Sequence, residues 1–286
     1  MKTLNLINTP GKPFVNSLTR VYVILALMAA ICSGCSASPN PEADKSGAAD
    51  STQVAQVQAE IIQDIVKPIF RELGRSVQNR PITAIEFKGK GNTRILIVGG
   101  IHGDEAETVS FSDSLVLYLE SLREYPFASS LTILPRLNPD GVAQKTRKNA
   151  NGIDLNRNFP TLDFKAGNPK DRYYGGKEPL SEPESQILFS LIDELKPDLV
   201  IMLHTPLNCV NYDGKAKEVA VQLSRVLSLP LKENIGYSTP GSVGTYYGKE
   251  RSLPVITLEF PARNDLWSRF GRQILNTIDA AISGNR

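Results

Sequence analysis

Several short, continuously apolar runs, separated by stretches with helical periodicity, constrain what this chain of 286 residues can fold into. Residues 94–98, 199–203 and 255–260 lack the polar alternation of a strand that has one face in water. Runs of this kind are typical of strands buried on both faces, and such a sheet needs helices on each side. The sequence therefore predicts an α/β fold whose mixed sheet carries helices on both faces.

The periodicity of apolar residues also gives the expected order of the elements. Helices are predicted at residues 57–73, 105–122, 181–195, 216–227 and 265–282, and further strands at 82–87 and 131–137. We expect the strands 82–87 and 94–98 to be neighbours, because only a short glycine-containing segment joins them. Ser181, Pro183 and Glu184 have the spacing of a capping box with proline in the first turn, which predicts Ser181 as the N-cap. The segments 138–180 and 235–254 are expected to be functional loops.

The N-terminus has the features of an export signal. Basic residues precede an apolar stretch too short to cross a membrane comfortably, and small residues follow it. The segment Ser33-Gly34-Cys35-Ser36 is similar to a bacterial lipobox, which predicts a lipid anchor through Cys35. Ordinary signal-peptide cleavage and an uncleaved membrane anchor are the alternatives. We expect the protein to be exported to the periplasm, where a lipid would tether it to the membrane.

Three parts of the chain follow from this interpretation. Residues 1–35 are a predicted signal peptide, residues 36–55 a flexible tether rich in small and polar residues, and residues 56–286 a catalytic domain. Residues 1–35 carry three basic residues and no acidic one, so the formal charge of +2 becomes −1 without them. Since no basic block remains, a nucleic-acid partner is not expected. Cys209 would be the one cysteine left, which excludes an intramolecular disulfide, and we expect it to be a packing residue.

Both histidines of the chain lie at the ends of predicted buried strands. His102 follows the run 94–98 and precedes Glu105 by three residues, and His204 closes the run 199–203. Ligands in open α/β sheets bind at the carboxyl ends of the strands, so these side chains are expected to converge. Two imidazoles and a carboxylate are a typical set of protein ligands for catalytic zinc. The alternative for each histidine is a hydrogen-bonded residue of the core.

Two further features indicate how a substrate could be held and attacked. Asn156 and Arg157 combine an amide with a planar guanidinium, a pair that suits recognition of a carboxylate, although a solvated polar turn has the same composition. Glu259 ends an apolar strand, where a carboxylate is costly unless it has a partner. Beside a metal it would be a candidate general base, and elsewhere a buried salt-bridge partner.

In this order and spacing, the motifs resemble those of the zinc carboxypeptidase superfamily over roughly residues 80–265, and within it the chain is similar to the murein peptide amidases. The segments that carry the resemblance are Gly100–Glu105, Asn138–Gly141, Arg147–Pro160, Ser181–Ser185, His204, Gly236–Gly244 and Ile256–Glu259.

The resemblance implies a role for each of these side chains. Zn²⁺ would be held by His102, Glu105 and His204, with a water completing its coordination. Glu259 would be the base that takes a proton from that water and passes it to the leaving amine. The remaining roles implied are oxyanion stabilisation by Arg147, grip of the substrate carboxylate by Asn156 and Arg157, capping of the substrate by Tyr237, and support of a ligand imidazole by Asp154.

The resemblance also implies a substrate, the peptides of peptidoglycan, cleaved between γ-D-glutamate and meso-diaminopimelate. The loop 161–180, with Lys165, Lys170, Arg172, Tyr173 and Tyr174, is a candidate wall of the substrate pocket. The alternatives are a metallocarboxypeptidase that releases the C-terminal residue of other peptides, a zinc deacylase that shares the His-x-x-Glu motif, and a non-catalytic wall-binding lipoprotein. An exported protein would meet intact peptidoglycan or its shed fragments.

Overall fold

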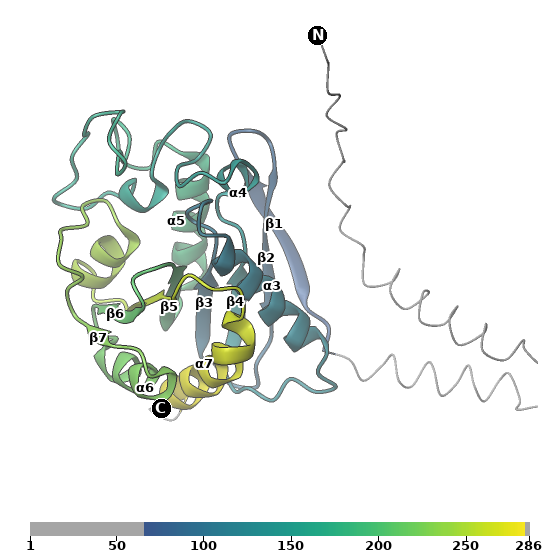
Figure 1. Ribbon diagram of the computed structural model, residues 1–286. Helices are drawn as coiled ribbons and strands as arrows, with labels where there is room; N and C mark the ends of the chain where they lie inside the picture. The colour runs from purple at the N-terminus through teal and green to yellow at the C-terminus, as the bar shows by residue number, and fades with distance from the viewer. Residues whose placement is uncertain (1–65, 284–286) are drawn as a thin grey trace, which may run out of the picture. The chain divides into compact units, whose positions relative to one another are not determined.

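The computed structural model describes residues 66–283 (Figure 1). The predicted signal peptide, the tether and most of the predicted helix 57–73 lie outside these residues. The strands are β1 (Ile69–Arg75), β2 (Pro81–Phe87), β3 (Arg94–Val98), β4 (Ser130–Leu134), β5 (Leu199–His204), β6 (Cys209–Asp213), β7 (Leu231–Lys232) and β8 (Val255–Glu259). The helices are α3 (Ala106–Glu120), α4 (Pro139–Gln144), α5 (Pro183–Leu195), α6 (Lys217–Leu227) and α7 (Leu266–Ser283), with a 3₁₀ turn, η1 (Leu155–Arg157), and a π-helical turn, η2 (Gly244–Lys249).

The strands form one mixed sheet in the order β1-β2-β4-β3-β5-β8-β6-β7. Its centre, β4-β3-β5-β8, is parallel, whereas β2 joins β4 and β6 joins β8 in antiparallel pairs. Parallel strands need crossover connections, and α3 provides the one between β3 and β4. The predicted mixed α/β sheet is therefore confirmed.

Side chains alternate between two apolar cores, one on each face of the sheet. In β3, Ile95 and Ile97 pack into the core covered by α3, α6 and α7. Leu96 and Val98 pack into the core on the opposite face, to which α5 and η2 contribute. This two-sided burial explains why the central strands are largely apolar. Within residues 66–283, no helix combines the length and the apolar character needed to span a membrane.

Three expectations from the sequence are wrong. The end of the predicted helix 57–73 is not helical, because residues from Ile69 onward form β1, an edge strand that pairs with β2. Strands β2 and β3 are not neighbours, because β4 lies between them and pairs with both. The short connection from β2 to β3 therefore does not determine which strands pair.

The third wrong expectation concerns the N-cap of α5, which is Glu182 and not Ser181. The Ser181 hydroxyl instead donates to the Glu182 carboxylate and accepts from Asn158 Nδ2. Glu184 does not complete a capping box, since its carboxylate accepts from the Val77 amide at 3.2 Å and from Asn149 Nδ2 at 3.0 Å. Contacts with distant segments thus replace the local cap.

Candidate metal centre and active site

The two histidines meet because they follow neighbouring parallel strands. His204 is the last residue of β5, and His102 lies in the loop that leaves β3 for α3. Since β3 and β5 pair in parallel, their carboxyl ends lie at the same edge of the sheet. The two rings lie with their centroids 4.8 Å apart, as the sequence led us to expect.

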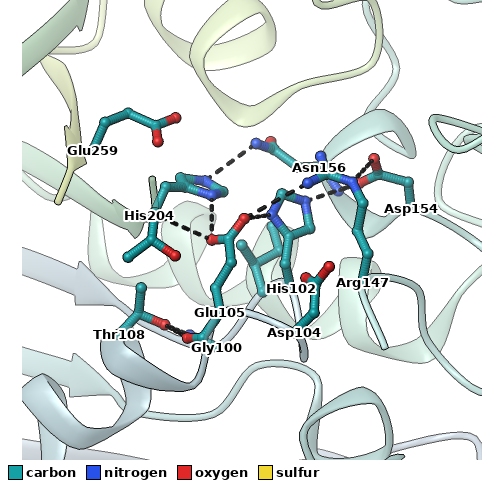
Figure 2. A network of polar contacts seen from close by, with 12 residues as sticks. Gly100, His102, Asp104, Glu105, Thr108, Arg147, Asp154, Asn156, His204 and Glu259 are labelled. Atoms are coloured by element: carbon teal, nitrogen blue, oxygen red, sulfur yellow. Dashed lines mark hydrogen bonds and ion pairs between the residues drawn. The ribbon is translucent and has the colours of Figure 1, made fainter. Parts of the chain in front are cut away.

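Glu105 lies between the two rings and contacts both of them (Figure 2). One of its oxygens is 2.8 Å from His102 Nδ1, and the other is 3.0 Å from His204 Nδ1. One ligand atom from each of these residues can be chosen so that all lie within 4.8 Å of one another, and all three residues are buried. The predicted metal ligands are therefore together in the structure.

A second set of contacts holds these side chains in place. The Asp154 carboxylate lies 3.1 Å from Nε2, the other nitrogen of the His102 ring. Arg147 Nε donates to the same carboxylate at 2.9 Å. The Thr108 hydroxyl donates to the Glu105 carbonyl at 2.8 Å and fixes the start of α3. Gly103 is needed between the ligands, since a Cβ there would lie 1.9 Å from the backbone of Gly141. The supporting position expected for Asp154 agrees with this geometry.

The electrostatics of the centre favour ionised carboxylates. Burial alone would raise the pKa of Glu105, but the charges of His204 and His102 and their hydrogen bonds outweigh it and hold that pKa well below its usual range. Burial acts in the same way on Asp154, and His102, Arg147 and Arg157 together lower its pKa well below the usual range. Both carboxylates are therefore charged at neutral pH.

This donor set fits a zinc ion. Two imidazole nitrogens and one carboxylate are ligands that zinc accepts, and they leave a coordination position for water or substrate. The second nitrogen of His102 is held by Asp154, the outer contact that fixes the ring of a metal-binding histidine. The geometry agrees with His102, Glu105 and His204 as the residues that hold the cofactor.

Glu259 is brought to the centre by the register of the sheet. Strands β5 and β8 pair so that His204 lies directly beside Glu259, and the two side chains share a face. The Glu259 carboxylate is buried and accepts from the Leu207 amide at 3.3 Å. Cys209 pairs with Glu259 across β6 and is fully buried, and burial and the nearby Glu259 charge raise the pKa of its thiol. Its position is that of a packing residue.

The guanidinium groups of Arg147 and Arg157 give the site its positive charge. Arg157 is buried, and burial, reinforced by the charge of Arg147, lowers its pKa although Asp154 opposes the shift. The Asn156 side chain accepts from the Val243 amide at 3.1 Å and lies 3.3 Å from His204 Nε2. One buried and one half-buried guanidinium, both close to the Asp154 carboxylate, form a site suited to an anion.

Aromatic side chains from two loops cover these cations. The Tyr173 ring lies 5.1 Å from the Arg147 guanidinium and 5.2 Å from that of Arg157. Tyr237 stacks on Tyr173 with 6.4 Å between the ring centroids. Of the candidate wall residues, Arg172 and Tyr173 line the cavity beside the metal ligands, whereas Lys165, Lys170 and Tyr174 are not among its lining residues. The predicted wall is thus correct only for its central part.

A cavity of about 410 Å³ connects the predicted metal ligands with the other predicted catalytic and substrate-binding residues, namely Glu259, Arg147, Asn156, Arg157 and Tyr237. Its lining also includes Asp213 and Lys249, which the sequence did not single out. Asp213 ends β6, a strand that the sequence did not predict, and Lys249 ends η2, which lies within the segment 235–254 that was expected to be a loop. The alternation Cys209, Asn211, Asp213 would have placed the aspartate on the same face as Glu259 if β6 had been recognised.

Comparisons with known proteins agree with this geometry. The family model described as zinc carboxypeptidase matches residues 59–251, which include the three metal-ligand candidates but not Glu259. Murein peptide amidase A of Escherichia coli (strain K12) is 36% identical over 206 residues, which cover 68% of this chain and 82% of that protein. Murein peptide amidase A of Vibrio campbellii is 35% identical over 200 residues, which cover 66% of this chain and 77% of that protein.

Two solved structures are similar to this chain. The crystal structure of murein-tripeptide amidase from Escherichia coli O157 matches with a TM-score of 0.62 and 32% identity, over 74% of this chain and 92% of that chain. Carboxypeptidase A of Helicoverpa armigera has the same fold, with a TM-score of 0.62 at 18% identity, over 92% of this chain and 79% of that chain. The chain therefore belongs to the zinc carboxypeptidase family and is a zinc metallopeptidase.

Proposed function

We propose that the protein hydrolyses the peptides of peptidoglycan, at the amide between the γ-carbonyl of D-glutamate and meso-diaminopimelate. The observation that carries the proposal is one cavity that joins the His102, Glu105 and His204 cluster to Glu259 and to the guanidinium groups of Arg147 and Arg157. The likeness to murein peptide amidase A, at 36% identity over 82% of that protein, supports the choice of substrate.

The residues of the chain suit the chemistry of amide hydrolysis. Zinc, when bound, supplies a Lewis acid that lowers the pKa of water and polarises the amide carbonyl. Glu259 accepts the proton of the attacking water and delivers it to the leaving amine, which is the work of a general base and then a general acid. Arg147, held by Asp154 at 2.9 Å, stabilises the negative charge that grows on the carbonyl oxygen.

The cavity can also recognise the substrate residue on the amine side of the scissile bond. Diaminopimelate carries a carboxylate on the carbon next to the scissile nitrogen, and Asn156 and Arg157 are placed to bind it. Arg157 offers a planar pair of donors, and its burial strengthens the interaction with an anion. Tyr237 and Tyr173 close the cavity over this carboxylate, since Tyr173 already lies against the Arg157 guanidinium.

The test is mass spectrometry of the products that the zinc-loaded protein forms from L-Ala-γ-D-Glu-meso-diaminopimelate. Free diaminopimelate should accumulate, a chelator should stop its release, and added zinc should restore it. If the folded, zinc-loaded protein leaves this peptide intact, the proposed bond is wrong.

A metallocarboxypeptidase acting on other peptides is the second candidate function, because Asn156 and Arg157 would bind any C-terminal carboxylate equally well. The same assay with α-linked peptides separates the two functions. Release of C-terminal residues from α-linked peptides alone would favour the carboxypeptidase. A non-catalytic wall-binding protein is disfavoured because a histidine or glutamate occupies each position that the metal and the base require.

We propose further that the protein is exported and carries lipid on Cys35. The basic and apolar N-terminal segment and the lipobox-like Ser33–Ser36 support this location. A C-terminal reporter that is active only outside the cytoplasm should be active in the fusion, and Cys35→Ala should abolish incorporation of a labelled fatty acid. Inactivity of this reporter, together with activity of a fusion to a second reporter that works only in the cytoplasm, would contradict the proposal.

A further inference from the structure

Two opposite charges lie together in the substrate cavity, away from the metal ligands. The carboxylate of Asp213, at the end of β6, is 3.5 Å from the ammonium of Lys249, at the end of η2. The Asp213 side chain is only 10% exposed, whereas that of Lys249 is 57% exposed. Both residues line the cavity that holds Glu259 and Arg157.

The backbone of η2 is shaped around the aspartate. A Cβ at Gly244 would lie 2.2 Å from Asp213 Oδ2, and one at Gly248 would lie 2.4 Å from Asp213 Cβ. Only glycine at these two positions leaves room for the carboxylate beside the turn. π-helical turns are rare and are frequently found at functional sites. The fold thus makes a specific place for a charge at the end of the cavity.

The carboxylate has unused capacity to accept hydrogen bonds. Within residues 66–283, Lys249 is its only ionic partner, and burial raises the pKa of Asp213 although the Lys249 charge opposes the shift. An ionised carboxylate has about four acceptor positions, so one partner at 3.5 Å leaves most of them free. A buried charge with so few partners is costly unless something else binds to it.

The position of Asp213 suits the far end of a substrate side chain. In the sheet, Cys209 pairs with Glu259 and Asp213 pairs with Val255, so Asp213 lies four residues along the strand from the candidate base. At about 3.4 Å per residue this is roughly 14 Å along the strand, and the side chains of Asp213 and Glu259 project from the same face of the sheet. Because Glu259, Asp213 and Lys249 line one cavity, a residue bound beside Glu259 can extend its side chain toward Asp213 and Lys249.

We infer that Asp213 and Lys249 form a specificity site for a side chain that ends in both an ammonium and a carboxylate on one carbon. Asp213 accepts from the ammonium of the ligand, and Lys249 donates to its carboxylate. These two contacts replace the ion pair that Asp213 and Lys249 form with each other in the free protein. A side chain that ends in an ammonium alone would be repelled by the Lys249 ammonium. A side chain that ends in a carboxylate alone would be repelled by the Asp213 carboxylate. The inference rests on the proposed function and names the part of the substrate that the cavity selects.

The test compares three peptides that differ only at the residue on the amine side of the scissile bond. That residue is meso-diaminopimelate, lysine, which lacks the far carboxylate, or 2-aminopimelate, which lacks the far ammonium. The wild-type protein should have the highest kcat/KM for diaminopimelate. Lys249→Met should reduce the preference over lysine, and Asp213→Asn the preference over 2-aminopimelate, each by at least about tenfold, the effect of one charge-assisted hydrogen bond.

Matched controls separate selectivity from folding. Lys215→Met removes an exposed lysine near β6 that does not line the cavity, and both preferences should remain unchanged. Zinc content and circular dichroism of each variant check that the fold is intact. Unchanged preferences in both Lys249→Met and Asp213→Asn would overturn the inference.

Failure of the proposed bond and failure of this specificity site give different results. If only α-linked peptides are hydrolysed, the γ-linkage is wrong, and the same three residues at the C-terminus of α-linked peptides still test the site. If no peptide is hydrolysed, calorimetry with the three free amino acids and the zinc-loaded protein replaces the kinetic assay. Equal binding of all three would overturn the inference, and tighter binding of diaminopimelate that both variants weaken would support it.

Discussion

Glu105 is the central residue of the metal centre, because one oxygen of its carboxylate contacts the His102 ring and the other contacts the His204 ring. A single side chain that contacts both rings fixes their separation before any ion binds. The Thr205 amide also donates to the same carboxylate, at 3.3 Å, so that the strand end and the start of α3 are joined. The chain therefore forms a preorganised site for zinc.

Glu259 and His204 lie side by side in the sheet, yet substitution of each should have a different effect. Glu259→Gln should retain zinc and lower kcat by about 10²- to 10⁴-fold, because a general base is lost while the metal ligands are intact. His204→Ala should lose both zinc and activity. Metal analysis and the peptide assay on the same preparations check both expectations.

The control for Glu259→Gln is Glu178→Gln, which makes the same change at an exposed residue of the loop 161–180. It should keep full activity. Full activity in Glu259→Gln would remove this residue from the mechanism, and loss of its zinc would show that Glu259 supports the metal centre instead of serving as the base.

The elements that could be predicted from the sequence are those with the clearest periodicity. The apolar strands β3, β5 and β8 were expected within one residue of their observed bounds, and so were α6 and α7. These strands place His204 and Glu259, and β3 leads into the loop of His102, so most of the site could be inferred from strand ends together with the family motifs. The roles of the individual residues remain predictions.

The elements that could not be predicted carry mixed or sparse signals. In β6, the polar residues Asn211 and Asp213 interrupt the apolar run, so the strand has no clear apolar signal in the sequence. Strand β7 has only two residues. The turn η2 has glycine at both Gly244 and Gly248, a composition typical of loops. Because Asp213 and Lys249 lie in these elements, the pair could not be found without the three-dimensional structure.

Packing of α3 on α7 is expected to support the fold from the face opposite the metal centre. Phe111 of α3 is buried against Phe260 and Trp267, with ring centroids 4.9 and 5.6 Å away. Phe111→Ala should lower the free energy of unfolding by about 3–5 kcal/mol, since it removes a buried aromatic ring and leaves a cavity. Denaturant unfolding of the zinc-loaded protein measures the change.

The matched variant is Leu117→Ala in the same helix, where the side chain is 54% exposed. Its effect should stay within about 0.5 kcal/mol. Folded Phe111→Ala should still bind zinc, because the metal ligands lie at the edge of the sheet and not in this core. A loss below about 1 kcal/mol for Phe111→Ala would mean that this core tolerates repacking.

At the scale of the whole domain, the metal centre connects segments that are far apart in the chain. Glu105 and His204 are separated by 99 residues, and the loop that carries Arg147 and Asp154 comes from between them. An ion bound at this point contacts two strand ends at once. Because the unfolded chain does not hold these residues together, zinc binds the native state preferentially and its binding contributes to stability.

Removal of zinc should therefore lower the thermal stability of the whole domain. At a free zinc concentration 100 times its Kd, the stabilisation is about 2.7 kcal/mol, and for a domain of this size that corresponds to a rise in Tm of roughly 5–11 °C. Calorimetric scans at several buffered zinc concentrations measure the shift. His204→Ala should show almost none, whereas Glu259→Gln should shift as the wild type does. A Tm of the wild-type protein that does not change with zinc would contradict a metal site at His102, Glu105 and His204, because an ion that binds only the native state must stabilise it.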